Sequence, residues 1–468
     1  MKPKHTKSSH RRRTKQTASA AGPVLNLLTH PHAAGIDVGA AEFVAAIPPG
    51  PDGEDGEKYV RTFPSFTSGV EALRDWLLAN GIKTASMEST GNYWITLYDT
   101  LVQAGIEVYL VNARHVKGVP GQKTDVKDAR WLQQLHGAGL LRKSFRPAQD
   151  IVPLRFVMRH RAEMSADASR QLQLMQKALT EMNLKIHHVF SDIDGASALA
   201  IIEAILAGER DADRLAALRD QRCKSPLETI KEALRGDYRP EYLFVLRQSY
   251  RSWQQLRAAM AECDTQIAAL SAQVARTVDT PLPPPAGKHQ HQTHKNSPQM
   301  AIFHEAWRFY GVDLSLAPGA GASVLTMLMS EIGTREQLLT AFPTAAAFCS
   351  WMGLCPDNRI SGGKVLKART RKVPNRLTAA LRLGVFGLNN ARNAMGDYYR
   401  RMKARLGKAE GTVAAAHKLA RILYTMIKNQ TAYDEKEAFK ITPSAAARRR
   451  RHLERQAAAL GLVLRPAA

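Results

Sequence analysis

The sequence predicts an α/β domain with a mixed sheet, followed by a long helical middle region and a mainly α-helical C-terminal domain. Short apolar strand patterns alternate with helical patterns up to about residue 150, whereas long helical patterns alone fill residues 151–275. Hydrophobic residues make up 44% of the 468 residues, enough to bury about two or three cores of ordinary size. This apolar content excludes an intrinsically disordered chain, despite the net charge of +24.

The elements of the first domain follow from these patterns in order. Residues 33–47, AAGIDVGAAEFVAAI, contain two apolar runs around a glycine turn and predict a β-hairpin, to which residues 59–63 add a third strand. A helix over 68–80, a strand ending in KTASMEST, a helix over 93–104 and the strand EVYLVN follow. Because helices and strands alternate, we expect helices on both faces of the sheet.

Changes in composition divide the chain further. We expect a flexible basic arm at 1–31, the α/β domain at 32–150 and a helical, coiled-coil-like spacer at 151–278. A linker rich in proline and histidine is predicted at 279–300, because proline and glycine interrupt the helical pattern there. The C-terminal helical domain spans 301–433, and a basic tail at 434–468 contains four consecutive arginines, Arg448 to Arg451.

Charge and cysteine content narrow the class of function. The pI near 10 indicates a polyanionic partner, and nucleic acid is the natural one. Four irregularly spaced cysteines form neither a disulfide framework nor a zinc ribbon, which is typical of a reducing compartment. No apolar run approaches the roughly 20 residues that a membrane helix needs. We expect no secretion signal, because only the short apolar stretch Val24 to Leu28 follows the basic N-terminus. We therefore expect a cytoplasmic protein, near the nucleoid, that does not enter a membrane.

Four acidic residues stand at positions where an α/β domain gathers functional groups. Asp37 lies near the end of the first predicted strand and Glu88 at the end of a later one, while Asp125 and Asp128 share one face at the start of a helix. Taken singly, each also fits a turn, a cap or an ordinary helix N-terminal charge. The order of the four on strand, strand and helix favours a common site.

Such a cluster of carboxylates predicts a divalent metal. Two unit charges 4 Å apart repel by about 4 kcal/mol at an effective dielectric constant of about 20, so a cation must lie between them. Magnesium prefers oxygen ligands, and two ions about 3.5 to 4 Å apart stabilise the attacking and leaving oxygens of a phosphodiester displacement. We expect two Mg²⁺ ions, which Mn²⁺ can replace.

Several segments resemble the transposases of the insertion sequence 110 family. GIDVGAAEFVAAI, MESTGNYW and VNARHVKGVPGQKTDVKDARWLQQLHGAGLL are similar to the RuvC-like DEDD domain of that family, which has an RNase H-like fold. The segment from LMSEIG to RTRKVPNRL is similar to its transposase domain. The resemblance implies that Asp37, Glu88, Asp125 and Asp128 bind the metal and that Ser361, in RISGGK, is the nucleophile.

The resemblance also implies partners. It indicates recombination through a phosphoserine intermediate, on donor and target DNA that a structured bridge RNA selects by base pairing. It implies a homo-oligomer, a dimer that pairs into a tetramer, with a composite site formed between protomers. Cations close to the acids and to Ser361 are expected to bind the nucleic acid backbone: Lys123, Lys127, Lys364, Lys367, Arg369, Arg371, Lys372 and Arg376.

Some expectations stay open at the level of sequence. Ser361 with Gly362 and Gly363 also fits a simple turn in a solvated basic loop. Pro374 stands where relatives usually have glycine, which makes the backbone of the loop after Ser361 uncertain. The alternatives in function are a DEDD site-specific invertase or a RuvC-like junction nuclease without serine chemistry, and an inactive nucleic-acid-binding assembly factor.

Overall fold

The computed structural model describes residues 28–50, 58–89, 91–112, 124–284, 293–367, 369–371, 373–440 and 443–463. The chain divides into two compact units, Met1–Arg146 and Pro147–Ala468. The first is α/β and the second mainly helical, so the predicted fold class is confirmed. Among the described residues, no helix combines the length and the apolar composition that crossing a bilayer requires.

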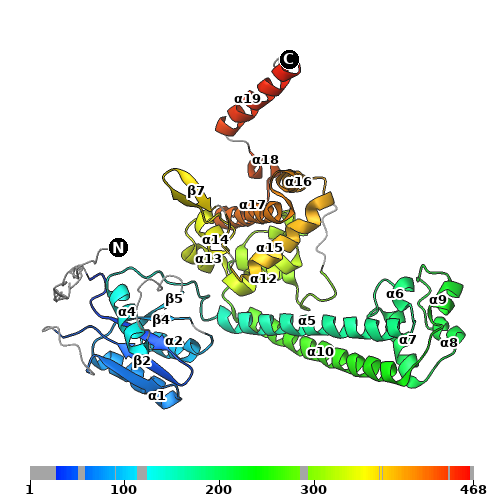
Figure 1. The fold of residues 1–468 in the computed structure, drawn as a ribbon, viewed down its shortest axis with the longest axis horizontal. Coiled ribbons are helices and arrows are strands. Elements are labelled where there is room, and N and C mark those ends of the chain that lie inside the picture. The colour runs from blue at the N-terminus through cyan, green and yellow to red at the C-terminus, as the bar shows by residue number, and fades with distance from the viewer. Residues whose placement is uncertain are drawn as a thin grey trace, which may run out of the picture. The chain divides into compact units, whose positions relative to one another are not determined.

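The first unit is built on a five-stranded mixed sheet of order β3-β2-β1-β4-β5 (Figure 1). Strands β1 (Ala33–Val38), β2 (Glu42–Ala46) and β3 (Val60–Pro64) are antiparallel, while β4 (Thr84–Glu88) and β5 (Glu107–Val111) run parallel to β1. The expected hairpin and third strand are therefore present. The parallel strands β1, β4 and β5 end at one edge of the sheet, where such sheets carry their sites.

Helices cover both faces of this sheet. Alternate residues of β1, such as Ala34 and Ile36, belong to a buried core shared with α1 (Thr67–Ala79) and α2 (Trp94–Gln103). Helix α4 (Asp125–Gly137) packs on the opposite face, where Ala129 joins Val44 in a smaller buried cluster. The strand alternation of period two decides which side chains meet α4.

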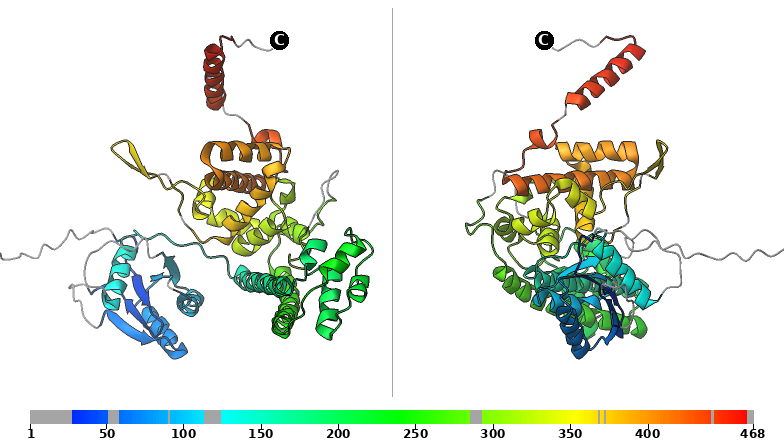
Figure 2. Two further views of the ribbon diagram at one scale, coloured as in Figure 1. Left: turned by 45° about the vertical axis from the view of Figure 1, so that its right-hand side comes forward. Right: turned by 90° about the vertical axis from the view of Figure 1, so that its left-hand side faces the viewer.

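Two long antiparallel helices open the second unit: α5 (Ile151–Glu181) and α10 (Pro240–Gln273), which lie side by side (Figures 1 and 2). Arg161 and Asp264 form an ion pair between them, and each side chain is only 6% exposed. The Arg161 guanidinium also donates to the backbone carbonyls of Asn296 and Ser297. These bonds hold the C-terminal part of the predicted linker, residues 293–300, against the long helices.

A lobe of four short helices joins the far ends of α5 and α10, within the region that the sequence predicted as a helical, coiled-coil-like spacer. It comprises α6 (Ile186–Val189), α7 (Ala196–Ala207), α8 (Ala212–Ala217) and α9 (Leu227–Ala233). Its buried core includes Ile201, Leu215 and Ile230, each 0% exposed. Gly208, with φ of 111°, ends α7 in the left-handed conformation that glycine favours.

The remainder of the second unit is a helical body with one β-hairpin. Its elements are α11 (Ile302–Tyr310), α12 (Ala322–Ile332), α13 (Arg335–Ala341), α14 (Ala345–Trp351), β6 (Arg359–Ser361), β7 (Lys364–Lys367), α15 (Arg376–Phe386), α16 (Ala394–Leu406), α17 (Lys408–Asn429), α18 (Glu435–Ala438) and α19 (Pro443–Ala459). The β6–β7 hairpin projects from the helices around it (Figure 2). Short 3₁₀ turns at Leu314–Leu316 and Gly387–Asn390 complete this body.

Candidate functional site

The strand register brings Asp37 and Glu88 to one edge of the sheet. Gly35 and Ile36 of β1 lie beside Ser86 and Met87 of β4, so the next pair in this parallel register is Asp37 and Glu88. Both acidic residues are half-buried. Because neighbouring strands lie about 4.8 Å apart, the two side chains leave the sheet as neighbours.

Both acids point to the face that α4 covers. The Ser86 hydroxyl lies 3.3 Å from the Leu132 carbonyl of α4, which puts position 86 on that face. Glu88, two residues further along, shares it because strand side chains alternate. On β1, a Cβ added to Gly35 would lie 2.3 Å from the Ala129 carbonyl oxygen of α4, so Asp37 also shares the face.

Helix α4 runs antiparallel to β1 and delivers its first turn to the same edge. The amide of His30, before β1, donates to the carbonyl of Gly137 at the end of α4, while Gly35 meets Ala129. From Gly35 to Asp37 the strand advances about 7 Å, and from Ala129 back to Asp125 the helix advances about 6 Å in the same direction. Asp125 therefore lies at about the level of Asp37, whereas Asp128 lies about 4.5 Å further along the helix axis, nearer the level of Gly35.

The first turn of α4 is well defined by its cap. The Thr124 hydroxyl accepts from the Lys127 amide at 3.3 Å, and both Asp125 and Asp128 follow within that turn. Asp125 is exposed and Asp128 half-buried.

The four carboxylates provide an oxygen-only donor set of the kind that suits Mg²⁺. Among the described residues, however, no three acidic, histidine or cysteine side chains come together closely enough to hold a metal ion. The acids share an edge without closing on one point. Lys127 lies exposed beside them, whereas Lys123 falls outside the described residues.

His136 supports this arrangement and escaped the analysis of the sequence. Its ring is fully buried between α4 and the sheet, with Nε2 2.9 Å from the Thr84 hydroxyl and the ring centroid 4.6 Å from that of Tyr109. Burial, together with the nearby His30, lowers the pKa of His136 to about 4. A histidine on an apolar helix face gives no local signal that distinguishes a buried role from an exposed one.

Ser361 lies at the turn of the β6–β7 hairpin in the second unit. It pairs with Lys364 across the hairpin, and Gly362 and Gly363 between them have φ of 53° and 76°. Two successive positive φ values are typical of a type I′ turn, for which glycine is favoured. Ser361 and Lys364 are exposed, so a hydroxyl and an ammonium group face solvent together.

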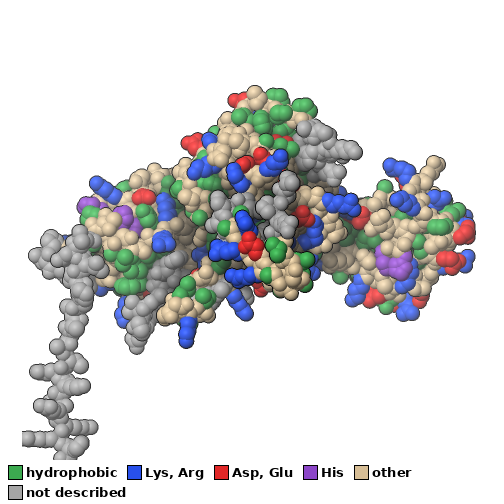
Figure 3. Space-filling model, turned by 90° about the horizontal axis from the view of Figure 1, so that it is seen from above, with side chains coloured by type: hydrophobic (Ala, Val, Ile, Leu, Met, Phe, Trp, Pro, Cys, Tyr) green, Lys and Arg blue, Asp and Glu red, His purple; other side chains and the backbone are tan. Residues whose placement is uncertain are grey.

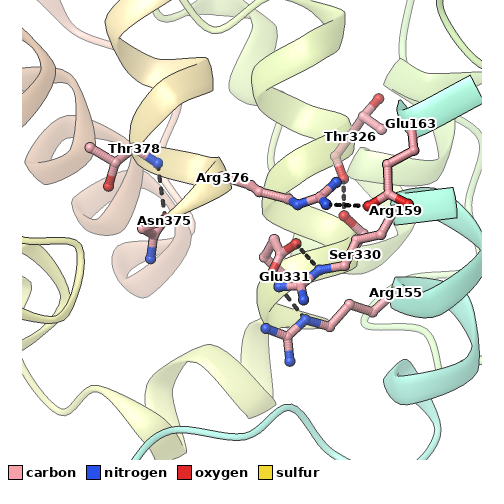
Figure 4. Close-up of polar contacts among 9 residues, drawn as sticks. All are labelled: Arg155, Arg159, Glu163, Thr326, Ser330, Glu331, Asn375, Arg376 and Thr378. Atoms are coloured by element: carbon pink, nitrogen blue, oxygen red, sulfur yellow. Dashed lines mark hydrogen bonds and ion pairs between the residues drawn. The ribbon is translucent and has the colours of Figure 1, made fainter. Parts of the chain in front are cut away.

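The cations predicted around Ser361 differ in their contacts. Arg369 and Arg371 are exposed, and Arg371 donates to the Ser350 carbonyl and hydroxyl. Arg376, at the start of α15, pairs at 2.9 Å with Glu163 of α5 (Figure 4). The side chain of Lys367 and the whole of Lys372 lie outside the described residues.

A buried carboxylate joins the long helices to the body that carries the hairpin. Glu331 of α12, whose side chain is 4% exposed, accepts from Arg155 at 2.9 Å and from Arg159 at 2.6 Å (Figure 4). Burial would raise the pKa of Glu331, but the hydrogen bond from Arg159 and the charges of both arginines lower it. Arg155, Arg159 and Glu163 recur every four residues and hence share one face of α5.

Basic and acidic side chains are interspersed on the α6–α9 lobe (Figure 3). Lys231 pairs with Asp213 at 2.6 Å, and Arg222 pairs with Asp220 at 2.9 Å. These cations are neutralised locally. Among the described cations that follow Ser361, Arg376 is paired in the same way with Glu163, whereas Arg371 donates to the carbonyl and hydroxyl of Ser350. The lobe is therefore a poorer match for a phosphate backbone than the hairpin region.

Two stretches of the chain match known families. Residues 34–184 match a family described as transposase, the DEDD transposase of IS110, and residues 313–400 match the family described as transposase IS116/IS110/IS902. A Streptomyces coelicolor protein, described as an uncharacterized 43.6 kDa protein of insertion element IS110, is 31% identical over 126 residues. This alignment covers 26% of the chain and 30% of the relative's own length. The first stretch contains all four acids, and the second contains Ser361.

Proposed function

Because this chain belongs to the IS110 family of transposases, we propose that it is a DNA transposase that cuts and rejoins donor and target DNA through a phosphoserine link. The observation that carries the proposal is the strand register, which aligns Asp37 with Glu88 on the face that receives the first turn of α4. The exposed hydroxyl of Ser361, beside Lys364 on a projecting hairpin, supplies a second, separate group for the chemistry.

In the proposed chemistry, the phosphoserine link retains the free energy of the broken phosphodiester bond, which rejoining requires. The Ser361 Oγ attacks the scissile phosphorus and loses its proton to solvent, while the bond from phosphorus to the 3′ oxygen breaks. The 3′ oxygen takes up a proton, so a phosphoserine and a free 3′ hydroxyl remain. The 3′ hydroxyl of the partner duplex then attacks the phosphoserine and releases Ser361.

We assign metal binding to Asp37, Glu88, Asp125 and Asp128. Bound Mg²⁺ would polarise the phosphate and neutralise the charge that develops on its oxygens, and Mn²⁺ would do the same. Lys127 beside these acids, and Lys364, Arg369 and Arg371 beyond Ser361, would hold the DNA backbone.

The choice of DNA sequence is assigned to a partner RNA. In this proposal a bridge RNA pairs with donor and target DNA, and the protein contributes charge and shape, as in other guide-directed systems. Two dimers would pair into a tetramer for strand exchange. Purifying the protein with the transcript that flanks its gene should yield one discrete RNA complementary to both DNAs. Recombination by RNA-free protein would instead favour a site-specific invertase.

Ser361→Ala should abolish the covalent protein-DNA adduct, because alanine has no nucleophilic oxygen. The adduct is measured on a denaturing gel after incubation with DNA, RNA and Mg²⁺, with and without chelator. Ser169→Ala, an exposed serine on α5, is the matched control and should form the adduct normally.

Three outcomes would contradict parts of the proposal. Recombination by Ser361→Ala at the normal rate would show that the nucleophile is wrongly assigned. Cleavage without any adduct in the unaltered protein would indicate a junction nuclease that uses water. Strand transfer that persists unchanged in an Asp125→Asn, Asp128→Asn double variant, or without divalent metal, would remove the carboxylates from the mechanism.

A further inference from the structure

A cavity of about 410 Å³ lies at the base of the β6–β7 hairpin. The segment after β7 forms one wall with Val373 and Pro374, and Val413 of α17 and Met352, which follows α14, form others. Arg371 and Arg382 complete the lining from the loop and from α15. The cavity thus combines aliphatic walls with two guanidinium groups, and none of its described lining residues is acidic.

The cations of this cavity are placed to meet an anion at its mouth. Arg371 and Arg382 are both exposed, and the Arg371 guanidinium is oriented by its bonds to the Ser350 carbonyl and hydroxyl. The Thr378 hydroxyl donates to the Met352 carbonyl at 2.8 Å, so this polar group already has a partner inside the protein. The lining is therefore aliphatic and cationic: Val373 and Pro374 are exposed like the two arginines, whereas Met352 and Leu354 are buried.

This combination matches the two halves of a nucleotide. A base removed from its stack needs close-packed apolar surfaces on its faces, and its phosphate needs guanidinium donors. The volume lies within the range of sites that enclose small organic groups, about 300 to 1,000 Å³. An acidic peptide would use the arginines but would leave the aliphatic walls without a partner.

The cavity lies within reach of the strand that Ser361 would attack. The backbone of the hairpin continues to its base, where Pro356 bridges Thr370 and the Asp357 amide donates to the Arg369 carbonyl at 2.9 Å. Five residues separate Pro356 from Ser361, a distance of about 16 Å along a strand. At about 3.4 Å per nucleotide, this corresponds to about five nucleotides.

We propose that this cavity receives one unpaired nucleotide of the DNA strand that is joined to Ser361, at most about five nucleotides from the scissile phosphate. The base lies between the Val373–Pro374 wall and Val413, and Arg371 and Arg382 bind the adjacent phosphate. This inference rests on the proposed function, since it takes the strand at the hairpin to be DNA. It makes Arg382 and Val413 determinants of how the cut strand is held.

Binding of a fluorescent oligodeoxythymidylate 8-mer to the full-length protein tests the cavity. Val413→Trp should fill the cavity and weaken binding about tenfold, the loss expected for one stacked or enclosed base. Arg382→Gln should weaken binding about threefold by removing a phosphate contact. Arg392→Gln, an exposed arginine after α15, is the matched control and should change affinity less than twofold.

A scan with single abasic sites locates the nucleotide without relying on the folding of Val413→Trp. The unaltered protein is incubated with DNAs that each carry one abasic site at a different position. The adduct yield should fall when the abasic site lies at one particular position within about five nucleotides of the scissile phosphate. In Arg382→Gln this position dependence should be weaker. Equal yields at every position, or binding by both cavity variants at the unaltered affinity, would overturn the proposal.

Further probes separate this inference from the proposed function and from other ligands. Ser361→Ala should bind the 8-mer normally. Suppose that the cavity variants weaken binding but the unaltered protein forms no adduct. This result would refute the serine chemistry, while the assignment of the cavity to a nucleotide would stand. Tighter cavity-dependent binding of oligouridylate would overturn the assignment to DNA, and thymidine monophosphate binding as tightly as the 8-mer would indicate a free nucleotide instead.

Discussion

At Gly35 a single hydrogen atom in place of a side chain lets helix α4 lie directly on the sheet. Its added Cβ would come within 2.2 Å of the Gln133 amide nitrogen and 2.3 Å of the Ala129 carbonyl oxygen. Any larger residue would force α4 outward and with it the first turn that carries Asp125 and Asp128. The carboxylate edge thus depends on a residue that contributes no chemistry.

His136 makes the stability of the packing between α4 and the sheet depend on pH. Its pKa of about 4 in the folded chain lies below the ordinary value of 6.5, so the unfolded chain binds more protons between these values. The contact should keep its full stability above pH 6.5 and lose on the order of 2 kcal/mol between pH 7 and pH 5. Hydrogen exchange of α4 and β4 amides, corrected for intrinsic rates, should report this loss. In His136→Gln it should disappear, and an unchanged pH dependence would refute the assignment.

Among the elements, α5 is joined to the hairpin-bearing body by ion pairs of two kinds. Glu331 is buried between Arg155 and Arg159, whereas Glu163 and Arg376 are 65% and 36% exposed. Exposed pairs contribute little, because water already solvates both charges. A buried carboxylate that loses its charge leaves its arginine partners poorly satisfied.

Glu331→Gln should therefore destabilise the second unit by about 2 kcal/mol, a value below that of fully buried pairs because Arg155 and Arg159 can still reach water. Glu163→Gln, which breaks a pair on the same helix face, should cost less than about 1 kcal/mol. Urea unfolding of the full chain, followed by circular dichroism, compares them. Equal losses for the two variants would mean that burial does not decide the strength of these pairs.

At the scale of the whole molecule, the basic residues behind the net charge of +24 differ in how far acidic neighbours neutralise them. Four basic residues of the α6–α9 lobe have acidic partners, among them Arg214 with Glu209 and Arg235 with Glu232. Helix α19 instead carries four consecutive arginines, Arg448 to Arg451, and its one acid, Glu454, pairs only with Arg450 among the described side chains, at 2.8 Å. Cations without acidic neighbours release more counterions when they bind a phosphate backbone.

Replacing Arg448 to Arg451 with glutamine should lower the salt dependence of duplex DNA binding. The slope of log affinity against log salt should decrease in magnitude by up to about 3, because each lost phosphate contact contributes about 0.9. Replacing the paired lobe residues Arg214, Arg222, Lys231 and Arg235 removes the same charge and is the control. It should change the slope by less than about 1, and an equal change in both variants would show that only total charge matters.

Local patterns predicted much of this chain. Periodicity of two and of 3.6 residues identified the strands and helices of the α/β unit, and the order of the acids on strand, strand and helix singled out Asp37, Glu88, Asp125 and Asp128. Ser361 was singled out by the resemblance to the transposase family and not by its local pattern. The strands and helices can be predicted from the sequence because each depends on residues that are close together in the chain. The lobe of α6 to α9 was missed, since the short helices there share the apolar pattern of the longer ones that surround them.

The amino-acid sequence by itself determined the strands and helices of the α/β unit, the acids at their ends and how basic the chain is, because propensity and charge are properties of neighbouring residues. Only the tertiary structure decided that α4 runs antiparallel to β1 over Gly35, that Glu331 lies buried between two arginines and that a cavity opens below the Ser361 hairpin. These features join residues from distant parts of the chain. They follow from how whole elements pack, a choice that no local pattern encodes.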